Sequence, residues 1–140
     1  KMLPTHRPDS STELLRHRAL EVTEAVVLGG GWTARHLHAD LIAVATESGQ
    51  TAFALSSQRN LVPILGVARD VEIARRMALA WGITPIYEPR PFSGSDEFLE
   101  YVVTWGTANE ILKPGAKVVF VASSKWGGVG GHDTLKVHVV

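Results

Sequence analysis

Apolar runs recur along this chain, and each is followed by a polar turn and a stretch with helical character. The runs cover residues 41–45, 61–67, 83–87 and 117–122. A short apolar run without polar alternation is typical of a strand that is covered on both faces of a sheet. Strands that alternate with helices predict a mainly parallel sheet between two helical layers.

The chain ends on a different kind of strand. Over residues 135–140, Lys136 and His138 alternate with Leu135, Val137 and Val139. This period of two predicts a strand that is exposed on one face, at an edge or in a hairpin. The loop before it is too short for a helical crossover, so the last strand is expected to be antiparallel. The predicted fold class is therefore α/β, a five-stranded and mostly parallel sheet in three α/β/α layers.

Helices are expected over residues 12–20, from about residue 23, over 51–55, from 71 to 80 and over 96–111. Asp70 is the predicted N-cap of the fourth of these, and Ser93 or Ser95 that of the fifth. The glycines 29–31 leave the second helix ambiguous. Because three glycines cost a helix about 2–3 kcal/mol relative to alanine, the default prediction is a loop. The alternative is a helix that continues to His38, in which the glycines allow close packing.

The length of 140 residues indicates a single domain. Residues 1–10, with Pro4 and Pro8, have the pattern of a linker, and residues 11–140 are expected to form one α/β domain. The start at Lys1-Met2 suggests a chain cut from a longer protein.

The turn between the first apolar run and its helix is the main candidate site. A strand that passes through Ser48-Gly49 into a helix directs backbone N–H groups and the positive end of the helix dipole at one spot. Such a spot suits a phosphate or a carboxylate, and the hydroxyls of Thr46, Ser48 and Thr51 add donors. The alternative is that Ser48 or Thr51 only caps the helix and Gly49 only makes the turn. The glycine-rich loop 123–134 also follows a strand, and ligands of such sheets bind at this edge.

Several function classes find no support in the sequence. The net charge of zero gives no electrostatic basis for binding nucleic acid or a membrane, and no apolar run reaches the length of a membrane span. The absence of cysteine excludes disulfides and fits a cytoplasmic protein. The histidines near Arg35 have no carboxylate at a ligand spacing, so no metal site is predicted. No nucleotide, hydrolase or metalloprotease motif is present, and no catalytic residue is assigned. A small hydrolase or transferase using Ser48 or His132 is the remaining enzymatic alternative.

Several segments resemble the C-terminal domain of pyruvate kinase. They are Ala-Val-Ala-Thr-Glu-Ser-Gly-Gln-Thr-Ala at 43–52, then residues 62–69, 74–86, 112–121 and 134–140. The similarity covers roughly residues 20–140, and its motifs fall in the family's order. It implies a five-stranded α/β/α domain with an antiparallel last strand, and a helix through residues 23–38.

The resemblance also implies a function. In the family this domain is regulatory, binds a sugar-phosphate effector and contributes subunit contacts. By position, the expected effector residues are Thr46, Glu47, Ser48, Gly49, Gln50 and Thr51 of the turn, with Lys125, Trp126, Gly127, Gly128, Gly130, Gly131 and His132 of the loop. A homo-oligomer through the last strand is expected, because that strand offers unpaired backbone groups.

The chain also departs from the family. No part of it resembles the catalytic barrel, where the family binds phosphoenolpyruvate, ADP, magnesium and potassium, so no cofactor and no phosphotransfer are expected of this chain alone. Gln50 stands where many members have a cation, and the region of Pro91 and Phe98 lacks the tryptophan and arginine that hold a second phosphate. Lys125 can compensate for one of these lost cations. The effector is therefore expected to be a monophosphate, another anion, or absent. The alternative is a stand-alone small-molecule-binding protein of the same fold.

Overall fold

A computed structural model describes residues 19–123 and 132–140 of the chain. The predicted linker and most of the helix expected over 12–20 lie outside these residues. The strands of the sheet are β1 (Leu41–Thr46), β2 (Ile64–Ala68), β3 (Ile83–Tyr87), β4 (Lys117–Ala122) and β5 (Thr134–Val139). The helices are α2 (Val22–Leu37), α3 (Gln50–Ser57), α4 (Val71–Met77) and α5 (Ser95–Ala108).

The five strands form one sheet in the order β3-β2-β1-β4-β5. Strands β1 to β4 pair in parallel, and β5 pairs with β4 antiparallel. Both the sheet and the direction of its last strand confirm the fold predicted from the alternating pattern. Strands β1, β2 and β4 are almost completely buried, as expected from their apolar sequences.

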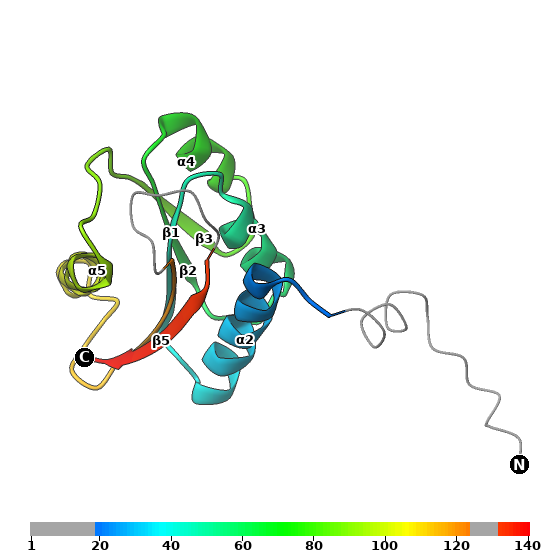
Figure 1. The fold of residues 1–140 in the computed structure, drawn as a ribbon. Coiled ribbons are helices and arrows are strands. Elements are labelled where there is room, and N and C mark those ends of the chain that lie inside the picture. The colour runs from blue at the N-terminus through cyan, green and yellow to red at the C-terminus, as the bar shows by residue number, and fades with distance from the viewer. Residues whose placement is uncertain (1–18, 124–131) are drawn as a thin grey trace, which may run out of the picture.

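Helices cover both faces of the sheet (Figure 1). On one face, α2, α3 and α4 bury Ala34, Leu55 and Met77 against β1, β2 and β4. On the other face, α5 buries Phe98 and Val102. The three-layer arrangement leaves the carboxyl ends of β1 and β4 at the same edge of the sheet, where the candidate turn lies.

The three glycines lie inside α2, so the default prediction of a loop was wrong and the helical alternative is confirmed. Close packing outweighs the poor helix propensity of glycine here. A Cβ on Gly30 would stand 3.0 Å from Val121 Cγ2 of β4. A Cβ on Gly31 would overlap the side-chain amide of Gln58, which lies at the end of α3. Backbone contact of this kind is available only to glycine.

The second strand begins three residues later than predicted, at Ile64 rather than Leu61. Arg59 and Leu61 both have positive φ angles, which an extended strand does not contain. The side chain of Asn60 accepts a hydrogen bond from Val62 N at 3.2 Å and stabilises this turn. Pro63 lies just ahead of the strand, where its missing N–H costs nothing.

The helix starts were predicted with mixed success. Asp70 caps α4 as expected, because its carboxylate accepts from Glu72 N at 2.7 Å. Neither Ser93 nor Ser95 caps α5, since the N-cap is Gly94, which makes no side-chain cap bond. Glu97 of the first turn instead accepts from the backbone N and the hydroxyl of Ser93. The carboxylate therefore holds the residue before the N-cap against the first turn of α5, but it does not cap the helix.

Strand β5 lies at the edge of the sheet, as predicted, but its apolar side chains are not buried. Leu135, Val137 and Val139 are all exposed, and Val139 retains 58% of its accessible surface. Leu135 packs over Gly29 and Gly30, so these side chains lie on the α2 side of the sheet. The described residues thus cover only part of the side of β5 that the sequence assigned to the core.

Candidate functional site

The candidate turn connects the carboxyl end of β1 to the first residue of α3. Gly49 is the N-cap and has a φ of 84°, a left-handed conformation that favours glycine. A Cβ at this position would also lie 3.0 Å from Phe53 and 3.3 Å from Ile73. Gly49 is therefore required by both its backbone angle and its close neighbours.

Two hydroxyls of the turn stabilise the turn itself. Thr46 is 5% exposed, and its Oγ1 accepts a hydrogen bond from Gly49 N at 2.8 Å. Ser48 Oγ accepts from Gln50 N at 3.3 Å. Neither bond caps the helix, because the N-cap of α3 is Gly49 and the helix has no side-chain cap bond, so the prediction that Ser48 or Thr51 caps α3 was wrong. Each hydroxyl acts as the acceptor in its bond and still carries a hydrogen that can be donated to a ligand.

The electrostatic field of the turn comes mainly from its backbone. The N–H groups of Thr51 and Ala52 lie in the first turn of α3, where helix geometry offers no carbonyl partner four residues earlier. Helix α3 carries no charged side chain to compete with its dipole. The charged residue of the turn is Glu47, whose exposed carboxylate opposes an anion. Gln50 is exposed and contributes an uncharged amide.

His132 contacts this turn although it lies far away in the sequence. Its Nδ1 is 2.8 Å from Thr51 Oγ1, and its Nε2 is 2.6 Å from the carbonyl oxygen of Ala45. The hydroxyl of Thr23 in α2 donates to the His132 carbonyl oxygen at 3.1 Å. One residue thereby joins the end of β1, the start of α3 and the start of α2.

The other loop residues expected at the site, Lys125, Trp126, Gly127, Gly128, Gly130 and Gly131, lie outside the described residues. The binding role of the turn and the loop stays a prediction. Sequence reasoning missed Thr23 and the carbonyl of Ala45 as partners of His132. No local pattern signals these contacts, because they join residues 109 and 87 positions apart.

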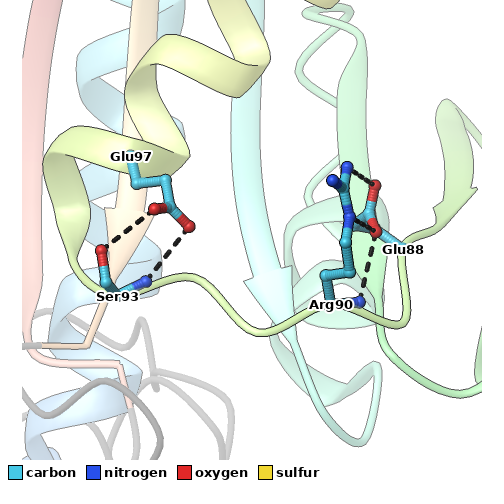
Figure 2. A network of polar contacts seen from close by, with 4 residues as sticks. All are labelled: Glu88, Arg90, Ser93 and Glu97. Atoms are coloured by element: carbon cyan, nitrogen blue, oxygen red, sulfur yellow. Dashed lines mark hydrogen bonds and ion pairs between the residues drawn. The ribbon is translucent and has the colours of Figure 1, made fainter.

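A second concave region lies between α5 and the loop that follows β3. It has a volume of about 620 Å³ and is lined by Glu88, Arg90, Pro91, Phe92, Glu97, Glu100, Tyr101, Thr104 and Trp105. Figure 2 shows the two polar contacts of this loop, one at Glu88 and Arg90 and the other at Ser93 and Glu97. No site was predicted here, because the region of Pro91 and Phe98 lacks the tryptophan and arginine that the family resemblance leads one to expect.

The ion pair of this loop is bidentate. Arg90 Nε and Nη2 lie 3.0 Å and 3.2 Å from the two carboxylate oxygens of Glu88, and the Arg90 backbone N donates as well. The Glu88 side chain is only 12% exposed, whereas Arg90 is 81% exposed. Hydrogen bonds from Arg90 hold the pKa of Glu88 below its ordinary value. Burial, together with the charge of Glu88, raises the pKa of Tyr101.

The described residues give no geometric support to the hydrolase alternative. Ser48 Oγ bonds to Gln50 N, and both ring nitrogens of His132 are paired with Thr51 and Ala45. No group of three potential metal ligands occurs within residues 19–123 and 132–140. In the same part of the chain, no helix has the length and apolar character needed to span a membrane.

Comparison with known proteins places these features in a family. The profile described as "Pyruvate kinase, alpha/beta domain" matches residues 24–138. The pyruvate kinase of Geobacillus stearothermophilus is 29% identical over 142 residues, which cover 99% of this chain and 24% of that protein. Pyruvate kinase 2 of Synechocystis is 34% identical over 107 residues, covering 76% of this chain and 18% of its own length. The pyruvate kinase of Clostridium acetobutylicum is 30% identical over 118 residues, which cover 84% of this chain and 25% of that protein. The chain thus spans about a quarter or less of these relatives.

Proposed function

The chain belongs to the pyruvate kinase α/β domain family, and from this membership we propose that it is the regulatory domain of a pyruvate kinase. In this proposal the domain binds a sugar-phosphate or another anionic effector at the turn of residues 46–51. It acts beside a catalytic barrel that converts phosphoenolpyruvate and ADP to pyruvate and ATP in the cytoplasm. The observation that carries the effector role is the free positive end of α3 at the carboxyl edge of the sheet.

The turn supports binding of a single anionic group. The N–H groups of Thr51 and Ala52 have no carbonyl partner within α3. The hydroxyl hydrogens of Thr46 and Ser48 are not used by the bonds that these oxygens accept. Helix N-termini bind phosphate through such donors and through the helix dipole. Because these contacts are short-ranged, they fit one phosphoryl group and not a second one at a distance.

The charges around the turn limit the effector further. Gln50 and Glu47 give the turn no cation, and a phosphate without a paired arginine or lysine forgoes its strongest hydrogen bonds. Phe98, near the start of α5, is buried in the core and offers no contact to a second phosphate. We therefore infer that a monophosphate or a comparable anion is preferred over a bisphosphate.

Calorimetric titration of the 140-residue chain with ribose phosphate, inorganic phosphate and fructose bisphosphate tests the effector role. Saturable binding is expected, with the bisphosphate gaining little over the monophosphate. The variant Ser48→Ala should weaken binding by several-fold, since it removes one exposed donor. Ser57→Ala is the matched control, because this serine lies at the opposite end of the same helix and bonds to Ala54 O. Equal loss in both variants, or no binding by the folded wild type, would remove the effector role.

Subunit contacts are the second part of the proposal. Strand β5 is the last strand of the sheet and has an unpaired outer edge among the described strands. Helix α2, which contacts β5, exposes three large apolar side chains, Val22, Leu28 and Trp32. An edge strand next to an apolar helix face is well suited to pair with a second copy across a two-fold axis. We therefore propose that the chain self-associates through β5 and α2.

A further inference from the structure

The ring of His132 has a defined tautomer in this structure because of its two partners. The carbonyl oxygen of Ala45 can only accept, so the Nε2 atom at 2.6 Å from it must carry a hydrogen. In the neutral ring, Nδ1 is then an acceptor. The bond of 2.8 Å between Nδ1 and Thr51 Oγ1 is therefore donated by the hydroxyl of Thr51.

This tautomer removes one donor from the candidate anion site. Thr51 is the second residue of α3 and is 6% exposed. While its hydroxyl hydrogen is directed to His132, Thr51 Oγ1 can offer only lone pairs to an anion. A lone pair of Thr51 Oγ1 repels an oxyanion. The neutral form of the His132 ring therefore disfavours the binding of an anion at the turn.

Protonation of His132 reverses the bond. When Nδ1 gains a proton it becomes a donor, and Thr51 Oγ1 becomes the acceptor. The hydroxyl hydrogen of Thr51 is then released and can be donated to an anion in the turn. The ring also acquires a positive charge one hydrogen bond away from that hydroxyl. Both changes favour an anion, and the bond from Nε2 to Ala45 stays in place throughout.

We propose that His132 and Thr51 form a proton-linked relay, in which a proton on His132 and an anion at the turn of residues 46–51 each strengthen the binding of the other. The inference rests on the proposed effector site and deepens it, because it assigns the regulation of that site to proton concentration. Thermodynamic linkage requires the effect to be reciprocal, so the anion must also cause proton uptake.

Other charged groups surround this relay. Strand β1 and helix α3 contribute no titratable side chain. Within residues 19–123 and 132–140, the titratable groups of the remaining neighbouring segments are Glu21, Glu24, Glu47, Arg69, Asp70, Asp133 and Lys136. Carboxylate, guanidinium and ammonium groups ordinarily keep one charge between about pH 5 and pH 8, whereas imidazole changes its charge there. His132 carries the one imidazole among the described residues around the turn.

Sulfate is the suitable probe, because it stays a dianion over this range while a phosphate gains a proton of its own near pH 6. Sulfate is titrated into the 140-residue chain by calorimetry at about pH 5.5 and about pH 8, in pairs of buffers with different ionisation enthalpies. The wild type is expected to bind sulfate about tenfold more tightly at the lower pH. At the higher pH, the binding of sulfate is expected to be accompanied by the uptake of protons.

Variants separate the relay from a structural role of His132. His132→Gln keeps an amide donor for Ala45 but cannot titrate, so its sulfate affinity should not change with pH. Thr51→Ser retains the hydroxyl and should retain the pH dependence. His138→Gln, on β5, is the matched control and should behave as the wild type. A purely structural His132 would instead lower the affinity equally at both pH values.

Each outcome decides a different claim. Sulfate binding that is independent of pH and occurs without proton uptake would overturn the relay and leave the effector site standing. Retention of the full pH dependence in His132→Gln would likewise overturn the relay. If the folded wild type binds neither sulfate nor a sugar phosphate at either pH, the effector site itself fails, and the relay fails with it.

Discussion

Thr51 and His132 are 81 residues apart in the chain, yet Thr51 Oγ1 lies 2.8 Å from His132 Nδ1. The contact fixes His132, two residues before β5, against the first turn of α3. Because the backbone of His132 also accepts from Thr23, the same residue ties the start of α2 to the turn. The candidate effector site and the surface proposed for subunit contacts are therefore connected by a short series of hydrogen bonds.

The first prediction concerns the stability that this contact provides. Thr51→Val keeps the shape of the side chain but leaves His132 Nδ1 without a partner, so it should destabilise the fold by about 1–2 kcal/mol. Thr51→Ser should cost clearly less, since the hydroxyl remains. Urea unfolding at neutral pH measures both variants. Equal stability of Thr51→Val and the wild type would show that the bond contributes nothing.

The glycines of α2 provide a second prediction with its own control. Gly31→Ala must displace Gln58, whose amide donates to Val27 O at 3.2 Å, so it should destabilise the domain by about 1–3 kcal/mol. At Gly29 an added Cβ meets Leu135 at 3.7 Å, an ordinary contact. Gly29→Ala should therefore stabilise the helix by up to about 1 kcal/mol. Thermal unfolding compares the two. A gain in stability from both would contradict the close packing of α2.

The ion pair of Glu88 and Arg90 gives a pH-dependent prediction. Arg90 lowers the folded-state pKa of Glu88 below its ordinary value of 4.5. A carboxyl with a lowered folded pKa contributes stability above its unfolded pKa, and this contribution is lost as the pH falls through the folded pKa. Glu88→Gln should thus be less stable than the wild type at pH 7, and the difference should vanish under acidic conditions.

Urea midpoints over a pH series measure this difference. Glu72→Gln is the control, because the pair of Glu72 with Arg75 is exposed on both sides and should contribute almost nothing at any pH. A difference for Glu88→Gln that persists or grows below the carboxyl range would mean that packing, rather than charge, explains the loss.

Self-association is tested by a charge on the exposed side of β5. Val139→Asp should convert oligomers to monomers in sedimentation at micromolar concentration, because a carboxylate opposes both strand pairing and apolar contact. The matched control is Leu79→Asp, at a position that is 89% exposed. Leu79 lies between α4 and β3, and β3 is at the opposite edge of the sheet from β5. A monomeric wild type, or dissociation by both variants, would contradict an interface at β5.

The sequence predicted those parts of the fold that depend on local pattern. The apolar runs of β1 and β4 form buried strands, as their sequences predict. Asp70 caps α4, as its place before a helical pattern predicts. Gly31 was misjudged because its effect depends on Gln58, 27 residues later, and not on helix propensity. The left-handed backbone at Leu61 likewise shortened β2 without a local signal.

The candidate site was predictable only in part. The turn of residues 46–51 follows from a strand, a glycine and a helix in sequence order. The contact between His132 and Thr51 could not be predicted in this way, because hydrophobic periodicity carries no information on residues that are 81 positions apart in the chain. The groove beside Tyr101 was missed for the same reason, because α5 and the loop after β3 form it together.

The most direct test of the effector site is the mapping of amide chemical shifts on the isotopically labelled chain during titration with ribose phosphate. The central claim predicts saturable shifts concentrated at the amides of Gly49, Thr51 and Ala52, with a further change at the ring of His132. Shifts confined to the groove of Tyr101 and Trp105, or no shifts at saturating ligand, would contradict the assignment of the turn as an anion site.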